Sequence, residues 1–227
     1  MFLSTMRTFS PSSRARLTHH DLDRFPGNTL FDRLGRVICQ VGCVPRKELF
    51  EAWEVARRTR RLFRGGRVVD LGAGHGLLAQ IMLILDNTSP YALAIDKALP
   101  SSTARVHDAL VAAWPRLAGR VSFLATAMDS VEIRPGDVVV SSHACGALTD
   151  VVLDRAVSAG ARVAVLPCCH DRAANDAGPL LGWMDASLAI DIRRAQRLEQ
   201  RGYRVWAQAI PPEVTPKNRL LLASPPA

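Results

Sequence analysis

Residues 68–79, VVDLGAGHGLLA, place one acid and three glycines where an apolar strand would turn into a helix. Asp70 ends the strand-like run, and Gly72, Gly74 and Gly76 follow at alternate positions. Dinucleotide-binding loops instead read Gly-x-Gly-x-x-Gly and present a helix N-terminus to an anionic pyrophosphate. Because the carboxylate of Asp70 would repel a pyrophosphate, the loop favours a ligand that carries an ammonium group.

Two later segments concentrate side chains that can take up protons or act as nucleophiles. They are residues 141–150, SSHACGALTD, and residues 166–171, LPCCHD. The imidazole of His143 can accept a proton near neutral pH, so His143 is a candidate base or substrate-orienting residue. A histidine that only hydrogen-bonds the backbone is the alternative. Asp150 is expected in the first turn of a helix, where it either orients His143 or stabilises the helix end.

The spacing of apolar residues predicts the elements that must position these side chains. Helices are expected over residues 45–63, 77–85, 102–114, 149–158 and 188–200, and strands over residues 68–70, 91–95, 121–124, 138–141, 162–166, 203–210 and 219–223. This alternation predicts an α/β fold, a mostly parallel seven-stranded sheet with helices on both faces. The last two strands lack a helix between them and should pair antiparallel near one edge.

Ligands of such sheets bind at the carboxyl ends of the parallel strands, so the site should lie there. We expect residues 1–44 to form a partly ordered N-terminal tail and segment. Residues 45–227 should form a single domain.

Six residues together resemble the first motifs of the class I S-adenosylmethionine (SAM)-dependent methyltransferases. That family has an acid and alternating glycines after its first strand, matched by Asp70, Gly72, Gly74 and Gly76. An acid ends its second strand and binds both ribose hydroxyls, and a polar residue after the third strand reads the adenine amino group. The matching residues are Asp96 in YALAIDK and Asp129, beside Met128, in TAMDS.

The resemblance implies a Rossmann-like class I methyltransferase fold, SAM as the cofactor and methyl transfer as the activity. Lys47, at the start of the helix expected over residues 45–63, is a candidate partner for the SAM carboxylate. A solvated lysine is the alternative.

The later segments are similar to one branch of this family. It comprises acceptor-stem tRNA ribose 2'-O-methyltransferases and related methyltransferase-domain proteins, which share a His-x-Cys-Gly-x-x-Thr-Asp motif and a Cys-Cys motif. The matches begin at His143 and at Cys168 and extend to His170, and the resemblance covers roughly residues 45 to 224. The tRNA enzymes also carry N-terminal zinc modules, for which this sequence has no room.

The cysteines leave three alternatives open. Cys145 and Cys168 lie where RNA cytosine-C5 methyltransferases place their cysteines, but Ala144 stands where a proline precedes the nucleophile. Small buried packing residues are the second alternative. A zinc site is the third, and since no Cys-x-x-Cys pair exists we expect no metal. We expect Cys168 and Cys169 to line the acceptor pocket without a covalent intermediate, with His170 as a further candidate base.

The charge balance bears on the methyl acceptor. The chain has 29 Lys and Arg against 21 Asp and Glu, a net charge of +8, which favours RNA as the partner, methylated at a ribose hydroxyl or a base. Basic clusters at residues 57–67 and 193–204 would form a phosphate-binding rim if they converge at the strand ends. Protein or small-molecule acceptors, and a SAM-binding module without turnover, are the alternatives.

Cysteine content and hydropathy indicate the cellular compartment of the protein. Five cysteines, an odd number, favour the reducing cytoplasm over a disulfide framework. No apolar run is long enough to cross a bilayer, so no membrane partner is expected. The oligomeric state is left open.

Overall fold

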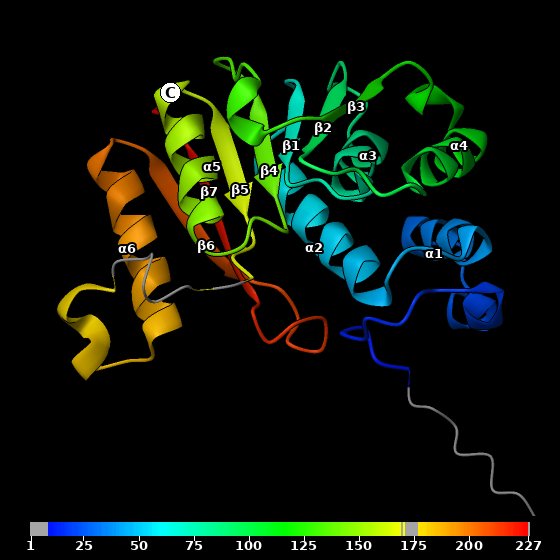
Figure 1. Cartoon of the computed structure of the whole chain (residues 1–227), viewed down its shortest axis with the longest axis horizontal. Coiled ribbons are helices and arrows are strands. Elements are labelled where there is room, and N and C mark those ends of the chain that lie inside the picture. Colours follow the sequence, from blue (N-terminus) through cyan, green and yellow to red (C-terminus); the bar gives the residue numbers. More distant parts are fainter. Residues whose placement is uncertain (1–8, 169, 171–176, 227) are drawn as a thin grey trace, which may run out of the picture.

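The computed structural model of the chain describes residues 9–168, 170 and 177–226. Within these residues the chain forms a seven-stranded sheet in the order β3-β2-β1-β4-β5-β7-β6 (Figure 1). The strands are β1 (Val68–Leu71), β2 (Ala92–Asp96), β3 (Val121–Ala125), β4 (Val138–Ser141), β5 (Arg162–Val165), β6 (Arg204–Ala209) and β7 (Arg219–Ser224). Strand β7 alone runs antiparallel to its neighbours β5 and β6, which confirms the predicted edge of the sheet.

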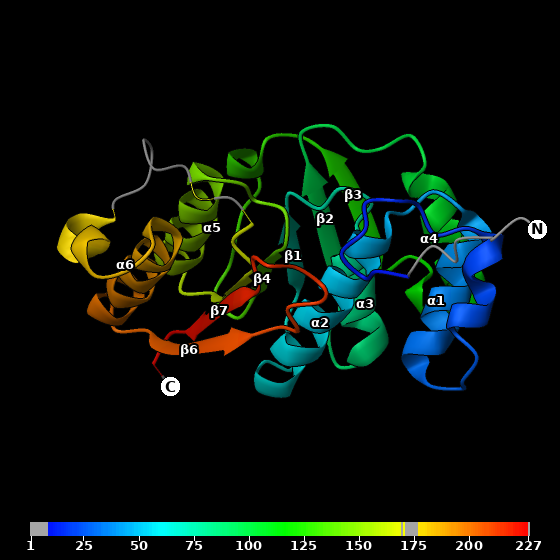
Figure 2. The ribbon, with the colours of Figure 1, turned by 90° about the horizontal axis from the view of Figure 1, so that it is seen from below.

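Helices cover both faces of the sheet, as the sequence predicts. They are α1 (Leu30–Val41), α2 (Arg46–Leu62), α3 (Leu77–Leu85), α4 (Thr103–Ala113), α5 (Ala147–Ser158) and α6 (Ala186–Gln200). Short 3-10 turns, η1 (His19–Arg24), η2 (Pro115–Leu117), η3 (Met128–Ser130) and η4 (Gly178–Gly182), connect them. Figure 2 shows α5 and α6 on one face and α2 and α3 on the other. In the described part of the chain, no helix combines the length and apolar character needed to cross a membrane.

The two faces divide the core because successive strand residues point to opposite sides. Val68 and Val138 pack in a cluster with residues of α1 to α4, whereas Val69 and Val139 pack in a second cluster with residues of α5 and α6. All four residues of β1 are buried, as are those of β4. Strands that are buried along their whole length are typical of a parallel sheet covered on both faces.

Helix α1 is the one long element that the sequence reading did not assign. Its residues Leu34 and Ile38 are buried in the same core as α2 and α3. Thr29 accepts a hydrogen bond from the Asp32 backbone N–H at its start, and Gly42 ends it in a left-handed conformation. A threonine N-cap and a C-terminal glycine are ordinary helix boundary signals, so the bounds of α1 could have been predicted from the sequence. The segment before residue 45 therefore shares the core of the sheet.

Gly76 allows the glycine loop to approach the sheet closely, and a substitution there should destabilise the fold. An added Cβ would lie 2.6 Å from the ring of Phe123, on a backbone with φ of +67°. We expect Gly76→Ala to lower the free energy of unfolding by roughly 2–4 kcal/mol.

Gly119→Ala is the matched control for this prediction. Gly119 also has a positive φ, +69°, but no atom lies within 4 Å of an added Cβ. Urea unfolding of both variants separates backbone strain from the steric clash. Equal losses in the two variants would contradict the close-packing argument.

Candidate functional site

A pocket of about 400 Å³ lies at the carboxyl ends of the parallel strands. Segments that follow four different strands contribute to its wall, and the helix α5 closes one side. Five residues singled out from the sequence line it: Gly72, Asp96, Met128, Asp129 and His143. The remaining lining residues are Ile95, Lys97, Ala127, Ala144, Leu148 and Val151. The topology thus brings together residues that are up to 79 positions apart in sequence (Gly72 to Val151).

Asp96 both lines the pocket and holds the glycine loop. Its Oδ2 accepts a hydrogen bond of 2.9 Å from the Gly74 backbone N–H. The carbonyl of Ile95 accepts two more, from Gly72 N at 2.9 Å and Ala73 N at 3.0 Å. The end of β2 therefore sets the path of the loop after β1.

Asp70 does not line this pocket. Its side chain is buried, and its Oδ2 accepts a hydrogen bond of 3.2 Å from the Ala79 N–H in the first turn of α3. Burial raises the pKa of Asp70 to about 8, and the negative charges of Asp96 and Glu48 add to this, against the Ala79 hydrogen bond. In this structure Asp70 thus fastens α3 to β1, and its proposed role toward an ammonium group stays a prediction.

The raised pKa of Asp70 predicts a pH-dependent stability. An unfolded aspartate ionises with a pKa of about 3.9, whereas the folded carboxyl holds its proton up to about pH 8. The free energy of unfolding should therefore fall as pH rises through that window. Asp70→Asn should remove this part of the dependence and keep an acceptor for Ala79. Urea unfolding at pH 5 to 8 measures it, with the exposed Asp154→Asn as control, and parallel profiles for wild type and Asp70→Asn would contradict it.

The N-terminal turn of α2 lies against the glycine loop through a pair that sequence reading missed. His75 Nδ1 lies 3.0 Å from Glu48 Oε1, and its Nε2 lies 3.0 Å from Ser102 Oγ before α4. His75 is nearly buried, and its two ring nitrogens link the glycine loop to α2 and to the start of α4. His75 stands between Gly74 and Gly76, and a histidine inside a glycine motif is a feature from which this pair could have been suspected.

Lys47 and Glu51 form a second pair on the same helix. Lys47 Nζ lies 3.4 Å from Glu51 Oε1, and the Glu51 side chain is nearly inaccessible. Burial raises the pKa of Glu51, while charges on Lys47 and His143 oppose the rise. Lys47 is therefore engaged with Glu51 on the side of α2 that faces His143, and its binding to a SAM carboxylate stays a prediction.

Hydrogen bonds fix the loop that carries His143. The Ser141 hydroxyl donates to the carbonyl of Leu71 at 2.5 Å and accepts from the Ala144 N–H at 3.2 Å. The Thr149 hydroxyl donates to the Ala144 carbonyl at 2.6 Å. The loop after β4 is thus anchored to β1 and α5, and His143 lies in the pocket wall between these anchors.

Asp150 lies in the first turn of α5, as predicted, and pairs with arginines of α6. Its Oδ2 accepts from Arg194 at 2.7 Å, and its Oδ1 accepts from Arg197. Burial alone would raise the pKa of Asp150, but these two arginines outweigh it and lower the pKa. Asp150 therefore ties α5 to α6, and the sequence-based hypothesis that it orients His143 gains no support from these contacts.

His170 joins the ionic cluster of Asp150 and Arg194 through Asp191 of α6. Its Nε2 lies 2.8 Å from Asp191 Oδ1, and Asp191 also pairs with Arg194 and Arg219. Burial would raise the pKa of Asp191, but His170 and Arg219 reverse the effect and lower it. Asp191 was missed in the sequence because it precedes no motif and sits within a helix.

The thiols of Cys145 and Cys168 lie next to each other, with their Sγ atoms 2.9 Å apart. Cys169 lies outside the described residues. Cys39 and Cys43 are buried at and just after the end of α1, in the core rather than at the strand ends. Among the described residues, no three His, Cys, Asp or Glu side chains are placed to hold a metal ion.

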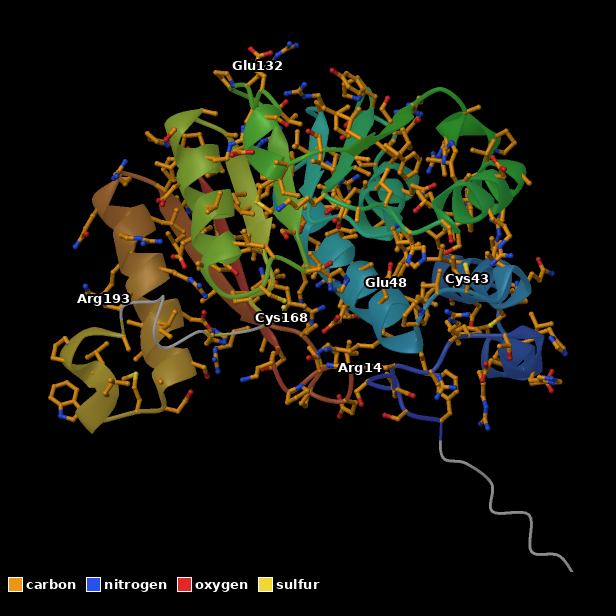
Figure 3. All side chains as sticks on the ribbon, viewed as in Figure 1. Arg14, Cys43, Glu48, Glu132, Cys168 and Arg193 are labelled. Carbon is orange, nitrogen blue, oxygen red and sulfur yellow. The ribbon has the colours of Figure 1, made fainter. Side chains whose placement is uncertain are left out.

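The two basic clusters do not converge at the pocket. The first leads from α2 into the amino end of β1, where Arg60 pairs with Asp86 and Arg67 with Asp137. Figure 3 shows Glu132, which hydrogen-bonds Arg67 through its carbonyl, at the edge of the sheet opposite Glu48 and Cys168. The condition for a joint phosphate-binding rim is therefore not met by residues 57–67, since Arg60 and Arg67 pair with acids at the amino ends of the strands.

A family model described as a methyltransferase domain matches residues 53–176, which include the loop after β1, the pocket and the Cys-Cys segment. The chain belongs to this methyltransferase family. Its strand order is that of the SAM-dependent class I methyltransferase fold, so the predicted family, fold class and cofactor class are confirmed.

Solved methyltransferase structures share this fold at low identity. The S-adenosylmethionine-dependent methyltransferase SibL matches with a TM-score of 0.51 and 18% identity over 93% of this chain and 66% of its own. The pyocyanin biosynthetic protein PhzM gives 0.50 and 20% over 80% and 58%. The M1A22 tRNA methyltransferase TrmK of B. subtilis gives 0.50 and 15% over 76% and 66%. The chain thus spans less than two thirds of each, and no curated protein matches it.

Proposed function

We propose that this chain binds SAM in the pocket at the strand ends and transfers its methyl group to RNA, at a ribose hydroxyl or a base. The observation that carries the proposal is the convergence of Gly72, Asp96, Asp129 and His143 on one pocket. Bound SAM would supply an electrophilic methyl group, so the chain needs mainly to align the acceptor and take up its proton.

Each pocket residue has a distinct role in this proposal. Asp96 accepts the hydroxyl protons of the ribose, as a carboxylate does at the same strand in nicotinamide enzymes. Met128 and Asp129, in η3, contact the adenine, and Gly72 lets the ligand approach the backbone. His143 lies on the α5 side of the pocket and is proposed as the base or orienter for the acceptor. Ala144 beside it is buried, which limits water at this point.

RNA is proposed as the methyl acceptor because of the charge of the chain and the chemistry of the family. The net charge of +8 favours a polyanion. TrmK shows that this fold can serve tRNA methylation. The odd number of cysteines, five, favours the cytoplasmic location expected from the sequence.

Methyl-labelled SAM, incubated with the chain and separate pools of RNA, proteins and metabolites, tests the proposal. Label in RNA is the expected result. Label confined to proteins or metabolites would replace the acceptor class but keep the enzyme. SAM binding by calorimetry without label in any pool would favour a regulatory SAM-binding module and overturn methyl transfer.

A further inference from the structure

The cations of this chain differ in whether an acid neutralises them. At the edge where the parallel strands begin, Arg60 and Arg64 both pair with Asp86, and Arg67 pairs with Asp137. The charges of such a pair cancel within a few ångströms. The excess positive charge of the chain, +8, therefore belongs to cations that have no acid partner.

Three exposed cations near the carboxyl ends of the strands pair with no acid among the described residues. They are Arg14 in the N-terminal segment, Lys97 after β2 and Lys217 in the loop between β6 and β7. Lys97 directly follows Asp96 and lines the pocket. The other two cations come from segments that reach the same edge by different routes.

Backbone hydrogen bonds hold the segment of Arg14 against the start of α2. The carbonyls of the residues on either side of Arg14 accept from the first two N–H groups of α2, at 3.0 and 2.9 Å. Glu48, in the same turn of α2, contacts His75 of the glycine loop. Figure 3 shows Arg14 on the same side of the sheet as Glu48, opposite Glu132. Arg14 therefore lies at the strand-end edge.

Strand direction places Lys217 at this edge as well. Strand β7 runs antiparallel to both β5 and β6, so β6 points the same way as β5 and the loop after it lies at the carboxyl ends. Ile210 and Val214 of this loop are buried in the core cluster that includes α2, whereas Lys217 is exposed. The packed part of the loop thus holds Lys217 outward on the α2 side of the sheet.

We propose that Arg14, Lys97 and Lys217 form an RNA-docking surface beside the pocket, in which each cation contacts a phosphate of the strand that carries the methyl acceptor. The choice of RNA rests on the proposed function. Only Lys97 of the three lines the pocket, so the three do not form a site for one small anion. An RNA backbone carries a charge at every nucleotide and can meet cations from three separate segments while one nucleotide enters the pocket.

The test measures binding of a fluorescein-labelled single-stranded RNA of about 20 nucleotides by anisotropy, at roughly 50 to 200 mM salt. Each phosphate contact on a single strand adds about 0.7 to the slope of log affinity against log salt. Arg14→Ala and Lys217→Ala should each weaken binding about fivefold at about 0.1 M salt and flatten the slope by about 0.7. The triple variant that adds Lys97→Ala should flatten the slope by about 2.

Two further variants control for unspecific effects of charge. Arg61 is an exposed cation at the far end of α2, so Arg61→Ala should leave the affinity and the salt slope unchanged. Glu213 is an exposed acid on the loop of Lys217, so Glu213→Gln should strengthen binding. Wild-type affinity in the triple variant, or an equal loss in Arg61→Ala, would overturn the proposal. Binding to phosphatidylserine vesicles without binding to the RNA would also overturn it.

Cofactor binding and methyl labelling separate this surface from the proposed function. Neither Arg14 nor Lys217 lines the pocket, so Arg14→Ala and Lys217→Ala should bind SAM with wild-type affinity in calorimetry. Equal methyl labelling of RNA by the wild type and the triple variant would overturn the docking surface and keep the proposed function. RNA binding that depends on the three cations, without methyl label in RNA, would support the docking surface and overturn RNA as the methyl acceptor.

Discussion

Asp96→Ala should weaken SAM binding by roughly a hundredfold or more. The substitution removes the acceptor of the Gly74 N–H, and it would also remove the two charge-assisted hydrogen bonds that we propose to the ribose. Hydrogen bonds to a charged group contribute about 1.5–3 kcal/mol each, and about 1.4 kcal/mol is a tenfold change in affinity. Isothermal titration calorimetry of SAM against the variant and the wild type measures the loss.

Two further variants separate ligand binding from loop structure. Asp96→Asn keeps an oxygen that can accept from Gly74, but it cannot accept both ribose hydroxyls as a carboxylate does. It should therefore retain the thermal stability of the wild type and still lose most of the SAM affinity. Asp108→Ala, an exposed acid on α4, serves as the control. Full SAM affinity in both Asp96 variants would place the cofactor elsewhere.

His143→Ala should lower the rate of methyl transfer by about a hundredfold while leaving SAM affinity within a few-fold. The residue lies in the pocket wall formed after β4, beside the first turn of α5, and the hydrogen bonds that anchor its loop come from the hydroxyls of Ser141 and Thr149. Single-turnover kinetics with labelled SAM and the acceptor isolates the chemical step from product release.

His20→Ala, an exposed histidine in η1, is the matched control for this prediction. Joint loss of SAM affinity and rate in His143→Ala would assign the histidine to the cofactor site or to the fold. An unchanged rate would leave it a structural residue. His170, whose imidazole is held by Asp191, would then be the next candidate base.

The predicted elements agree with the structure to within about two residues at nearly every boundary, because local chemistry decides them. Helix α3 begins and ends where the sequence places it, at Leu77 and Leu85, and strand β4 has its predicted bounds. The acid and glycine spacing around Asp70 likewise identified the family. Such patterns are readable because a turn, a strand period and a helix period each depend on neighbouring residues.

Only the tertiary structure decided which of the polar residues act together. Asp70 and Asp96 look equivalent in the sequence, yet one is buried against α3 and the other lines the pocket. Asp150 pairs with Arg194, 44 positions later, a contact that its place in the sequence did not indicate. The contact of Cys145 with Cys168 also joins loops separated by a whole helix and strand. Spacing along the chain carries no record of these distances, because parallel strands bring distant strand ends to one edge of the sheet.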